Sequence, residues 1–442
     1  MPRLNQKQNK SAVVPSSRIP VAEFTPAMKE THTILIPMML PIHFELIEKV
    51  LQNEGYKTEL LRTEGSRIAE EGLKNVHNDT CYPALLVIGQ MMDALHSGKY
   101  DPHKIAFLIT QTGGGCRASN YIYLLRKALV KSGYGYIPVV GINLSALRGG
   151  TGFRVTVPML YDIAHCIVLG DMLMCLHNQC LPYELRKGDT QRVTDKWIGE
   201  IKKALDGKHY QCAGKLKALY PAIVRDYGMV KRSKERKIRV GVVGEIYVKY
   251  SPLGNNNLEK FLIAEGAEPV VPGLMAFLLY CVYNGIEDRE LYGGSVWNAV
   301  GSDMLYRYLV GKQKQVVRAI RKEGSFDAPT PFSETVKLAD GYISKGVKMG
   351  EGWLLTAEMV ELIHEGVENI VCTQPFGCLP NHIVGKGMIR AIREKHPDAN
   401  IVAVDYDPGA SEVNQQNRIK LMLDTAAAKI RERKLTAGVS AT

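Results

Sequence analysis

The sequence lacks the motifs that would place it in several common classes of protein. Its 442 residues contain no paired C-x2-C spacing, which structural zinc sites usually show. They contain no G-x-x-x-x-G-K-S/T phosphate loop, and VGVVGE is a poor match to the dinucleotide fingerprint G-x-G-x-x-G. No internal repeat of fixed period is visible either. A zinc-finger protein, a P-loop nucleotidase, a nicotinamide dehydrogenase and a solenoid are therefore not expected.

Targeting and membrane signals are also missing. The N-terminal stretch MPRLNQKQNKSAVVPSSRIP is polar and basic, without the apolar core of a signal peptide. No later segment has an uncharged stretch long enough to span a bilayer, so we expect a cytoplasmic protein with no membrane partner. Because cytosolic thiols stay reduced, the nine cysteines are expected to serve as metal ligands, catalytic groups or buried apolar residues rather than as disulfides.

The formal net charge of +11 suggests anionic partners. Part of this charge lies in the N-terminal tail and in the run KRSKERKIR at 231–239, and no aromatic residues alternate with it. A nucleic-acid surface normally combines basic and aromatic side chains, so no nucleic-acid partner is expected.

Strand and helix patterns alternate in two parts of the chain, which predicts an α/β fold with two parallel-sheet, Rossmann-like lobes. Residues 1–30 form an N-terminal arm without periodic hydrophobicity. Residues 31–150 form the first lobe, which contains the buried strand THTILIPMML and the strand KIAFLIT. Residues 151–236 have helical spacing and form a connector, and residues 237–442 form the second lobe, with the strands KIRVGVVG, ENIVCTQ and ANIVAVDYD.

Three cysteines lie in or beside loops where strands give way to helices. Cys81 lies in NDTCYPALLVIGQ, Cys116 in ITQTGGGCRASNY and Cys378 in VCTQPFGCLPNH. Ligands of open parallel sheets bind where such loops converge, so these thiols are candidate metal or redox groups. Taken singly, each is as well explained as a buried apolar residue. That reading is preferred for the remaining cysteines in apolar stretches, Cys166, Cys212 and Cys281, and is weaker for Cys175 and Cys180.

The same segments resemble a known superfamily. NDTCYPALLVIGQ, QTGGGCRASNY, QPFGCLPNHIVGKG and VDYDPGASEVNQQNRIKLML are similar to motifs of the iron-sulfur superfamily of 2-hydroxyacyl-CoA dehydratases, benzoyl-CoA reductases and double-cubane cluster proteins. Within it, the chain most resembles the C-terminal part of large acyl-CoA dehydratase activase-related proteins. The resemblance extends from about Arg18 through Leu423, nearly the whole chain.

The resemblance implies an oxygen-sensitive iron-sulfur cluster between the two lobes. Its ligands would be Cys81, Cys116 and Cys378, with Cys372 as the additional candidate, and the cluster would be either a 4Fe-4S cubane or an 8Fe-9S double cubane. Three thiolates on a cubane leave one iron open for a substrate oxygen. A separate ATP-dependent activase with its own iron-sulfur cluster would supply the electron. A homodimer or a related second subunit is implied as well.

By this resemblance the chain is the iron-sulfur component of an ATP-dependent low-potential reductase or of a reductive 2-hydroxyacyl-CoA dehydratase. Its substrate would be an acyl-CoA or another small molecule. The alternative is a non-catalytic iron-sulfur protein that stores or relays electrons and has no substrate site. A relay should show no spectroscopic response to acyl-CoA thioesters.

Further residues beside the cysteines are candidates for binding the cofactor or the substrate. Gly114 and Gly115 would let the backbone approach a cluster, and Arg117 and Asn120 follow Cys116 at a helix start, where they would bind an anionic group. A surface arginine and a helix cap explain the last two equally well.

Two residues are candidate catalytic groups. Glu245 follows the strand IRVGVVG at the expected cleft and could act as a base, and His382, four residues after Cys378, could donate a proton. A histidine at a helix start is also common as a capping or packing residue.

Overall fold

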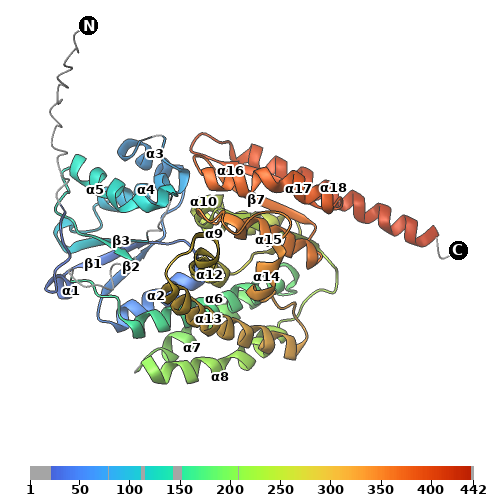
Figure 1. Ribbon diagram of the computed structural model, residues 1–442, viewed down its shortest axis with the longest axis horizontal. Helices are drawn as coiled ribbons and strands as arrows, with labels where there is room; N and C mark the ends of the chain where they lie inside the picture. Colours follow the sequence, from blue (N-terminus) through green and yellow to red (C-terminus); the bar gives the residue numbers. More distant parts are fainter. Residues whose placement is uncertain (1–20, 78, 111–114, 143–151, 208, 440–442) are drawn as a thin grey trace, which may run out of the picture.

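Two parallel sheets and a helical layer make up the protein. The computed structural model describes residues 21–439 except 78, 111–114, 143–151 and 208. Figure 1 shows the first sheet on the left, the second on the right, and the helices α6, α7, α8 and α13 below them. The sheet orders are β2-β1-β3-β4 and β6-β5-β7-β8, and every strand pair is parallel. The predicted α/β class with two parallel-sheet lobes is confirmed.

The first lobe has four short strands with helices on both faces. The strands are β1 (Thr33–Pro37), β2 (Lys57–Leu61), β3 (Ile105–Thr110) and β4 (Val139–Ile142). The helices are α1 (Met28–Thr31), α2 (Pro41–Asn53), α3 (Ser66–Asn75), α4 (Tyr82–His96) and α5 (Tyr121–Lys131), with the 3-10 turns η1 (Pro102–Lys104) and η2 (Arg117–Asn120). Because a parallel sheet is covered on both faces, its two central strands are apolar along most of their length, as ILI in β1 and IAFLI in β3 show.

The second lobe repeats this plan with more helices. Its strands are β5 (Ile238–Gly244), β6 (Ala267–Val270), β7 (Asn369–Pro375) and β8 (Asn400–Tyr406). Its helices are α9 (Ile246–Tyr250), α10 (Pro252–Asn255), α11 (Leu258–Ala264), α14 (Phe332–Leu338), α15 (Gly352–His364), α16 (Leu379–Val384), α17 (Ile389–Lys395) and α18 (Glu412–Val439), with the turn η5 (Lys386–Met388).

The helical layer draws on two parts of the chain. Helices α6 (Val157–Cys180), α7 (Asp189–Ala204) and α8 (His209–Gly228), with the turn η4 (Leu181–Tyr183), come from the segment between the sheets. The long hairpin of α12 (Leu274–Tyr292) and α13 (Val296–Glu323) leaves the second lobe after β6 and packs on α6, with α13 also contacting α8.

Helix α6 corrects one expectation from the sequence. The span Val157–Tyr183 is long and apolar enough to cross a membrane by length and composition, with a mean hydropathy of 1.6. That window is 67% buried inside the fold, against α2, α8, α12 and α13. The expectation that no segment could span was therefore wrong, but the burial of this helix is that of a core helix in a soluble protein.

The two lobes share one hydrophobic core. Leu35 of β1 and Phe107 of β3 belong to the same buried cluster as Val240 of β5 and Val404 of β8. A backbone hydrogen bond from the Tyr82 amide to the Phe376 carbonyl, 2.9 Å long, also joins the lobes directly. The loops that follow the strands of both sheets are thereby held against one another.

Candidate metal centre

Each of the three predicted ligand cysteines is the residue immediately before a helical turn. Cys81 precedes α4, Cys116 precedes η2 and Cys378 precedes α16. Proline follows two residues after both Cys81 and Cys378, where its fixed backbone angle suits a helix start. The sequence therefore places all three thiols at the junctions of loops and helices, where backbone amides of the first turn lack helical partners.

A glycine brings two of these loops into contact. Gly377, immediately before Cys378, has a φ of +73°, a conformation that side-chain-bearing residues rarely adopt. A Cβ atom at this position would stand 3.0 Å from the Cα atom of Cys81. The close approach of the Cys81 and Cys378 segments thus depends on the absence of a side chain at Gly377.

The three thiols form one electrostatic neighbourhood. Cys116 interacts with both Cys81 and Cys378, and the Cys81 thiol lies 3.1 Å from the Tyr121 hydroxyl. Burial raises the pKa of Cys81 to about 11, despite the Tyr121 hydrogen bond, and raises the pKa of Cys116 and Cys378 as well. Ionising these thiols together requires a positively charged group beside them.

Two carboxyl groups belong to the same neighbourhood. Glu245 interacts with all three thiols, and Glu351 interacts with Cys116 and Cys378. Burial, with Glu351 nearby, raises the pKa of Glu245 to about 8, and burial raises the pKa of Glu351 too. The Val248 amide donates to Glu245 and the Ile246 amide donates to Glu351, both at 2.9 Å. Glu245 was predicted from its place after β5. Glu351 was missed, because it arrives from a loop without a recognisable motif.

Three thiols from three loops are the type of ligand that an iron-sulfur cluster uses. Within the described ranges, no three Cys, His, Asp or Glu side chains stand close enough to hold one metal ion. Buried thiols with raised pKa values are stabilised as thiolates by a cationic iron core.

The loop after β3 is described only in part. Gly114 lies outside the described residues, and Gly115 donates its amide hydrogen to the Met349 sulfur at 3.0 Å. Arg117 and Asn120 are exposed, and Asn120 makes no capping hydrogen bond although it precedes α5. The cap explanation of Asn120 therefore does not hold, and its role as a ligand-binding residue stays a prediction.

The residues around Cys378 divide between surface and core. His382 is exposed, and its amide donates to the Cys378 carbonyl at 3.2 Å. Cys372 is fully buried on β7, and its thiol donates to the Asn381 side chain at 3.7 Å. Cys372 packs in a different apolar cluster from Cys81, so its place as a further ligand stays a prediction.

The remaining cysteines lie in varied surroundings. Cys166 and Cys180 are fully buried in the core, and the side chain of Cys212 lies outside the description. Cys281 was expected in the core, but it is exposed on α12 and interacts with Glu351. A thiol on the helical layer therefore lies near Glu351, one of the two carboxyl groups of the cysteine site, and no sequence motif indicated this.

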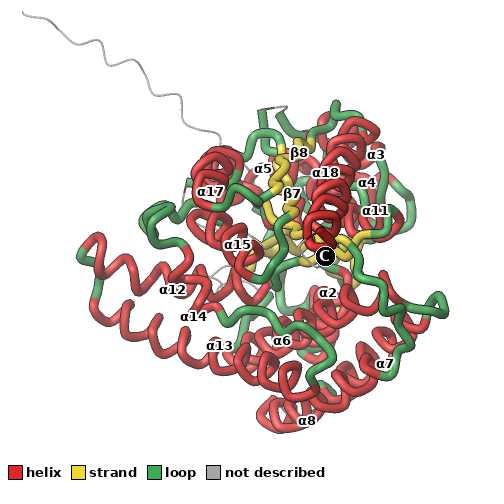
Figure 2. Tube along the Cα trace, turned by 90° about the vertical axis from the view of Figure 1, so that its right-hand side faces the viewer, coloured by secondary structure: helices red, strands yellow, loops and turns green. Residues whose placement is uncertain are grey.

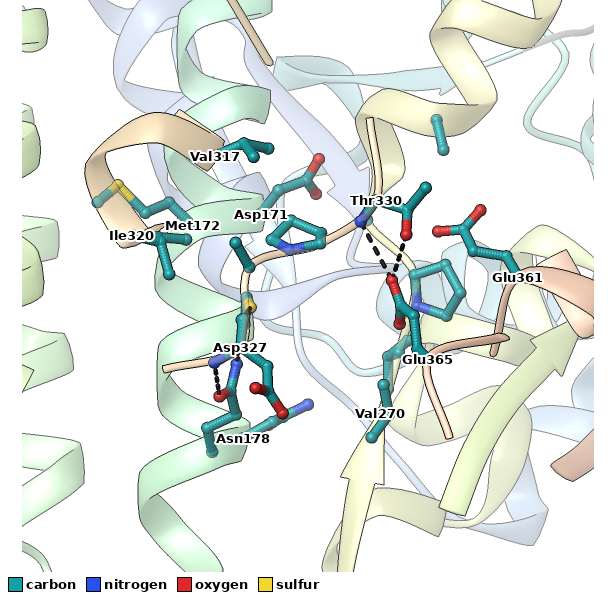
Figure 3. A pocket seen from close by; sticks show the side chains of 18 of the residues that line it. Asp171, Met172, Asn178, Val270, Val317, Ile320, Asp327, Thr330, Glu361 and Glu365 are labelled. Carbon is teal, nitrogen blue, oxygen red and sulfur yellow. Dashed lines mark hydrogen bonds between the residues drawn. The ribbon is translucent and has the colours of Figure 1, made fainter. Parts of the chain in front are cut away.

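A cavity of about 310 Å³ lies apart from the three cysteines. Figure 3 shows Asp171 of α6, Glu361 of α15 and Glu365, the residue after α15, around the cavity. Thr330, in the loop before α14, lies beside them. Glu365 accepts hydrogen bonds from the amide and hydroxyl of Thr330, at 3.1 and 2.5 Å. Cys175 lines this cavity, but none of the three predicted ligands does.

Helix α15 connects the cysteine site to this cavity. Glu351 precedes the helix at the cysteine end, and Glu361 and Glu365 lie at the cavity end. Between them, Glu358 accepts from Lys249 of α9 at 2.9 and 3.0 Å, and both side chains are almost fully buried. A row of buried ionisable groups thus follows one helix from one site to the other.

Comparisons with known proteins add nothing to this description, because no protein-family model and no curated protein matches the chain.

Proposed function

We propose that Cys81, Cys116 and Cys378 hold an iron-sulfur cluster between the lobes, as a 4Fe-4S cubane or an 8Fe-9S double cubane. The observation that carries the proposal is the meeting of three loop thiols and two carboxyl groups from both lobes in one buried neighbourhood. The motif resemblance supports an iron-sulfur cluster rather than another kind of metal centre. When bound, such a cluster supplies low-potential electrons and an iron that can bind a ligand.

The residues of this chain have distinct tasks in the proposal. Gly377 allows the two lobes to bring Cys81 and Cys378 together, and Tyr121 orients the Cys81 thiol. Burial and the neighbouring Glu351 raise the pKa of Glu245 to about 8, which favours the protonated form of its carboxyl group at neutral pH. Glu245 is thus a candidate proton donor for a reaction beside the thiols.

The proposed activity is that of the iron-sulfur component in an ATP-dependent low-potential reductase or a reductive 2-hydroxyacyl-CoA dehydratase. A separate activase supplies the electron, and an acyl-CoA or another small molecule is the substrate. The motif resemblance supports this assignment, together with the raised pKa of Glu245 beside the three thiols.

A second candidate is an electron-storage or relay protein. It is favoured by the cavity at Asp171 and Glu361, since the room for a small molecule there lies away from the three cysteines. It is also favoured by the exposure of Arg117 and His382, which places them at a surface where another protein can bind.

Anaerobic purification followed by iron and sulfide analysis tests the cluster. About four irons per chain indicate a cubane and about eight a double cubane, whereas an iron-free protein loaded with zinc contradicts both candidates. Electron paramagnetic resonance of the reduced protein, recorded with and without acyl-CoA thioesters, separates the two. A thioester-dependent change indicates the reductase or dehydratase, and an unchanged spectrum indicates the relay.

A further inference from the structure

The cavity between α6 and α15 has room for a small molecule. Figure 2 shows α15 above α6 and α13, and we call the space that these helices line the α6–α15 cavity. Its volume of about 310 Å³ is at the lower end of the range for small-molecule sites, about 300–1,000 Å³. Much of its lining is apolar, and Figure 3 shows Met172, Val317 and Ile320 on one side of it. A ligand of this cavity should therefore have an apolar part.

The charged side chains around the α6–α15 cavity are mostly acidic. Among the described residues, five carboxyl groups and one guanidinium group line it: Asp171, Glu268, Asp327, Glu361, Glu365 and Arg239. Arg239 already pairs with Glu268 and Asp327, at 3.5 and 3.4 Å. The phosphate groups of a nucleotide or of coenzyme A would meet an excess of like charge here, which costs binding free energy. The lining instead favours a cationic ligand.

Two of these carboxyl groups have an oxygen that the protein leaves without a donor. Glu361 and Glu365 are four residues apart at the end of α15, so their side chains lie side by side. Thr335 donates to Oε2 of Glu361 at 2.6 Å, and Thr330 donates to Oε1 of Glu365. In the part of the chain that the structure describes, Oε1 of Glu361 and Oε2 of Glu365 accept no hydrogen bond. The pair can therefore accept hydrogen bonds from a ligand.

A third acceptor comes from α6. Asn178 lines the α6–α15 cavity and is only 6% exposed. Its amide nitrogen donates to Glu259 at 2.7 Å, which leaves its carbonyl oxygen on the other side of the amide group. Within the described ranges, no donor meets this oxygen. A ligand that carries hydrogen-bond donors would satisfy it.

A protonated amine suits these acceptors better than a metal ion does. A metal ion needs several ligands that converge on one point, and no group of three His, Cys, Asp or Glu side chains among the described residues provides them. An alkylammonium group, like that of lysine, carries three N–H donors and one positive charge. Its hydrocarbon part can be buried against the apolar lining.

We propose that the α6–α15 cavity binds a small aliphatic amine, with its ammonium group between Glu361 and Glu365 and its hydrocarbon chain on the apolar lining. A volume of about 310 Å³ holds roughly ten non-hydrogen atoms, if each takes about the 30 Å³ of a water molecule. A straight-chain amine of about four to six carbons therefore fits. None of the three predicted ligand cysteines lines this cavity, so the proposal holds whether or not they bind a cluster.

Binding of the amine should release a proton. Burial raises the pKa of both Glu361 and Glu365, and Glu365 raises that of Glu361 further. The other charged or titratable groups that face the pair are Asp171, Glu268, Asp327, Arg239, Lys249, Glu358 and Cys175. The two cations among them already have carboxylate partners. An ammonium group that replaces the proton should bind more tightly as the pH rises, by up to about ten-fold per pH unit.

Isothermal titration calorimetry of the purified holoprotein with three four-carbon probes tests the proposal. Butylamine should bind as one molecule per chain. Butan-1-ol and butanoate, its neutral and anionic counterparts, should each bind more than about 30-fold more weakly, the loss expected when one partner of a buried charge pair is missing. Between about pH 6 and about pH 8, the affinity for butylamine should increase, and the heat should depend on the buffer that takes up the proton.

Two variants and a control locate the bound amine. Glu361→Gln should weaken butylamine binding by more than about 30-fold, because it removes the charge and keeps the shape of the side chain. Ala276→Leu should also prevent binding, since Ala276 lines the cavity and a larger side chain would fill it. Glu394→Gln is the matched control, because it removes a carboxylate of α17 that is 63% exposed and lies outside the cavity. This control should bind butylamine as the native protein does, and circular dichroism should stay unchanged in all three.

Three results would each overturn the proposal. Butan-1-ol that binds as tightly as butylamine would show an apolar cavity without a cation site. Unchanged binding by both Glu361→Gln and Ala276→Leu would place the amine elsewhere, and Mn²⁺ that competes with butylamine would show a metal site.

The same samples separate this proposal from the proposed function. Iron per chain reports on the cysteine site, and butylamine binding reports on the α6–α15 cavity. An iron-containing protein that does not bind butylamine contradicts the amine site alone, and an iron-free protein that binds it contradicts the cluster alone.

Discussion

Single residues decide how closely the two lobes meet. Gly377 combines a positive φ with a backbone contact to Cys81, and Cys116 is the thiol that interacts with the other two. These positions differ in kind, because Gly377 fixes the path of the backbone whereas Cys116 supplies a side chain. Substitution of Gly377 should therefore affect both stability and iron binding, whereas substitution of Cys116 should affect mainly iron binding.

Gly377→Ala should lower the free energy of unfolding by about 1–3 kcal/mol through backbone strain and should also reduce iron retention, because the Cys81 segment must move away. Gly266→Ala is the matched control, since Gly266 has a φ of +79° but nothing within 4 Å of its absent Cβ. Urea denaturation and iron analysis of both variants measure the two effects. Equal iron retention would contradict the role given to the contact.

Cys116→Ala should remove most of the iron, whereas Cys166→Ala should keep it. Cys166 is fully buried in the core, so its loss costs packing but no ligand. Iron per chain after anaerobic purification gives the answer, with circular dichroism as the control for folding. Similar iron contents in the two variants would count against Cys116 as a ligand.

At the scale of helices, buried ionisable side chains distinguish α15 and α6 from ordinary core helices. Lys249 of α9 and Glu358 of α15 form an ion pair that water hardly reaches. His177 of α6 is held neutral, because burial lowers its pKa to about 4. The effect of each feature on the free energy of unfolding can be measured, by substitution for the ion pair and by a change of pH for the histidine.

Lys249→Met should destabilise the protein by about 3–5 kcal/mol, since Glu358 is left as an unpaired buried carboxylate. The double variant Lys249→Met with Glu358→Leu should recover much of this loss, because it removes both charges. Urea unfolding of the two variants measures the difference. A double variant no more stable than the single one would show that the buried charge is not the cause.

His177 should make the protein less stable in weak acid. Its folded pKa of about 4 lies below the ordinary 6.5, so the unfolded chain binds a proton first as the pH falls. Above pH 6.5 the histidine has no effect, and between pH 6.5 and 4 stability falls by up to about 3 kcal/mol. His177→Gln should flatten this part of the curve of unfolding free energy against pH. An unchanged slope would contradict the assignment.

At the scale of the molecule, local patterns predicted more than contacts between distant segments. THTILIP, KIAFLIT and ENIVCTQ became β1, β3 and β7, because buried parallel strands are recognisable as apolar runs bounded by turns. Glu245, Cys116 and Cys378 could be predicted as neighbours, because each follows a parallel strand and the ends of such strands converge. Glu351 and Cys281 could not be predicted as part of this site. They are close because α15 and α12 pack near each other, and the hydrophobic periodicity of a sequence does not show which helices pack together.

The membrane expectation failed for a related physical reason. A core helix such as α6 is apolar on all sides, and only the surrounding helices distinguish it from a membrane span. The exposure of Trp297 and Met304 on α13 was also not predicted, because an amphipathic pattern shows which residues share a face but not whether that face is covered.

The core common to both lobes also has a consequence for biosynthesis. Leu35 and Phe107 are translated early, whereas Val404, which packs in the same cluster, emerges near the end of the chain. At about 5–20 residues per second, the nascent first lobe waits on the order of tens of seconds with part of its apolar surface unpaired. The first lobe therefore completes its apolar core only after the second lobe has been synthesised, and the cysteines of the two lobes meet only at that stage.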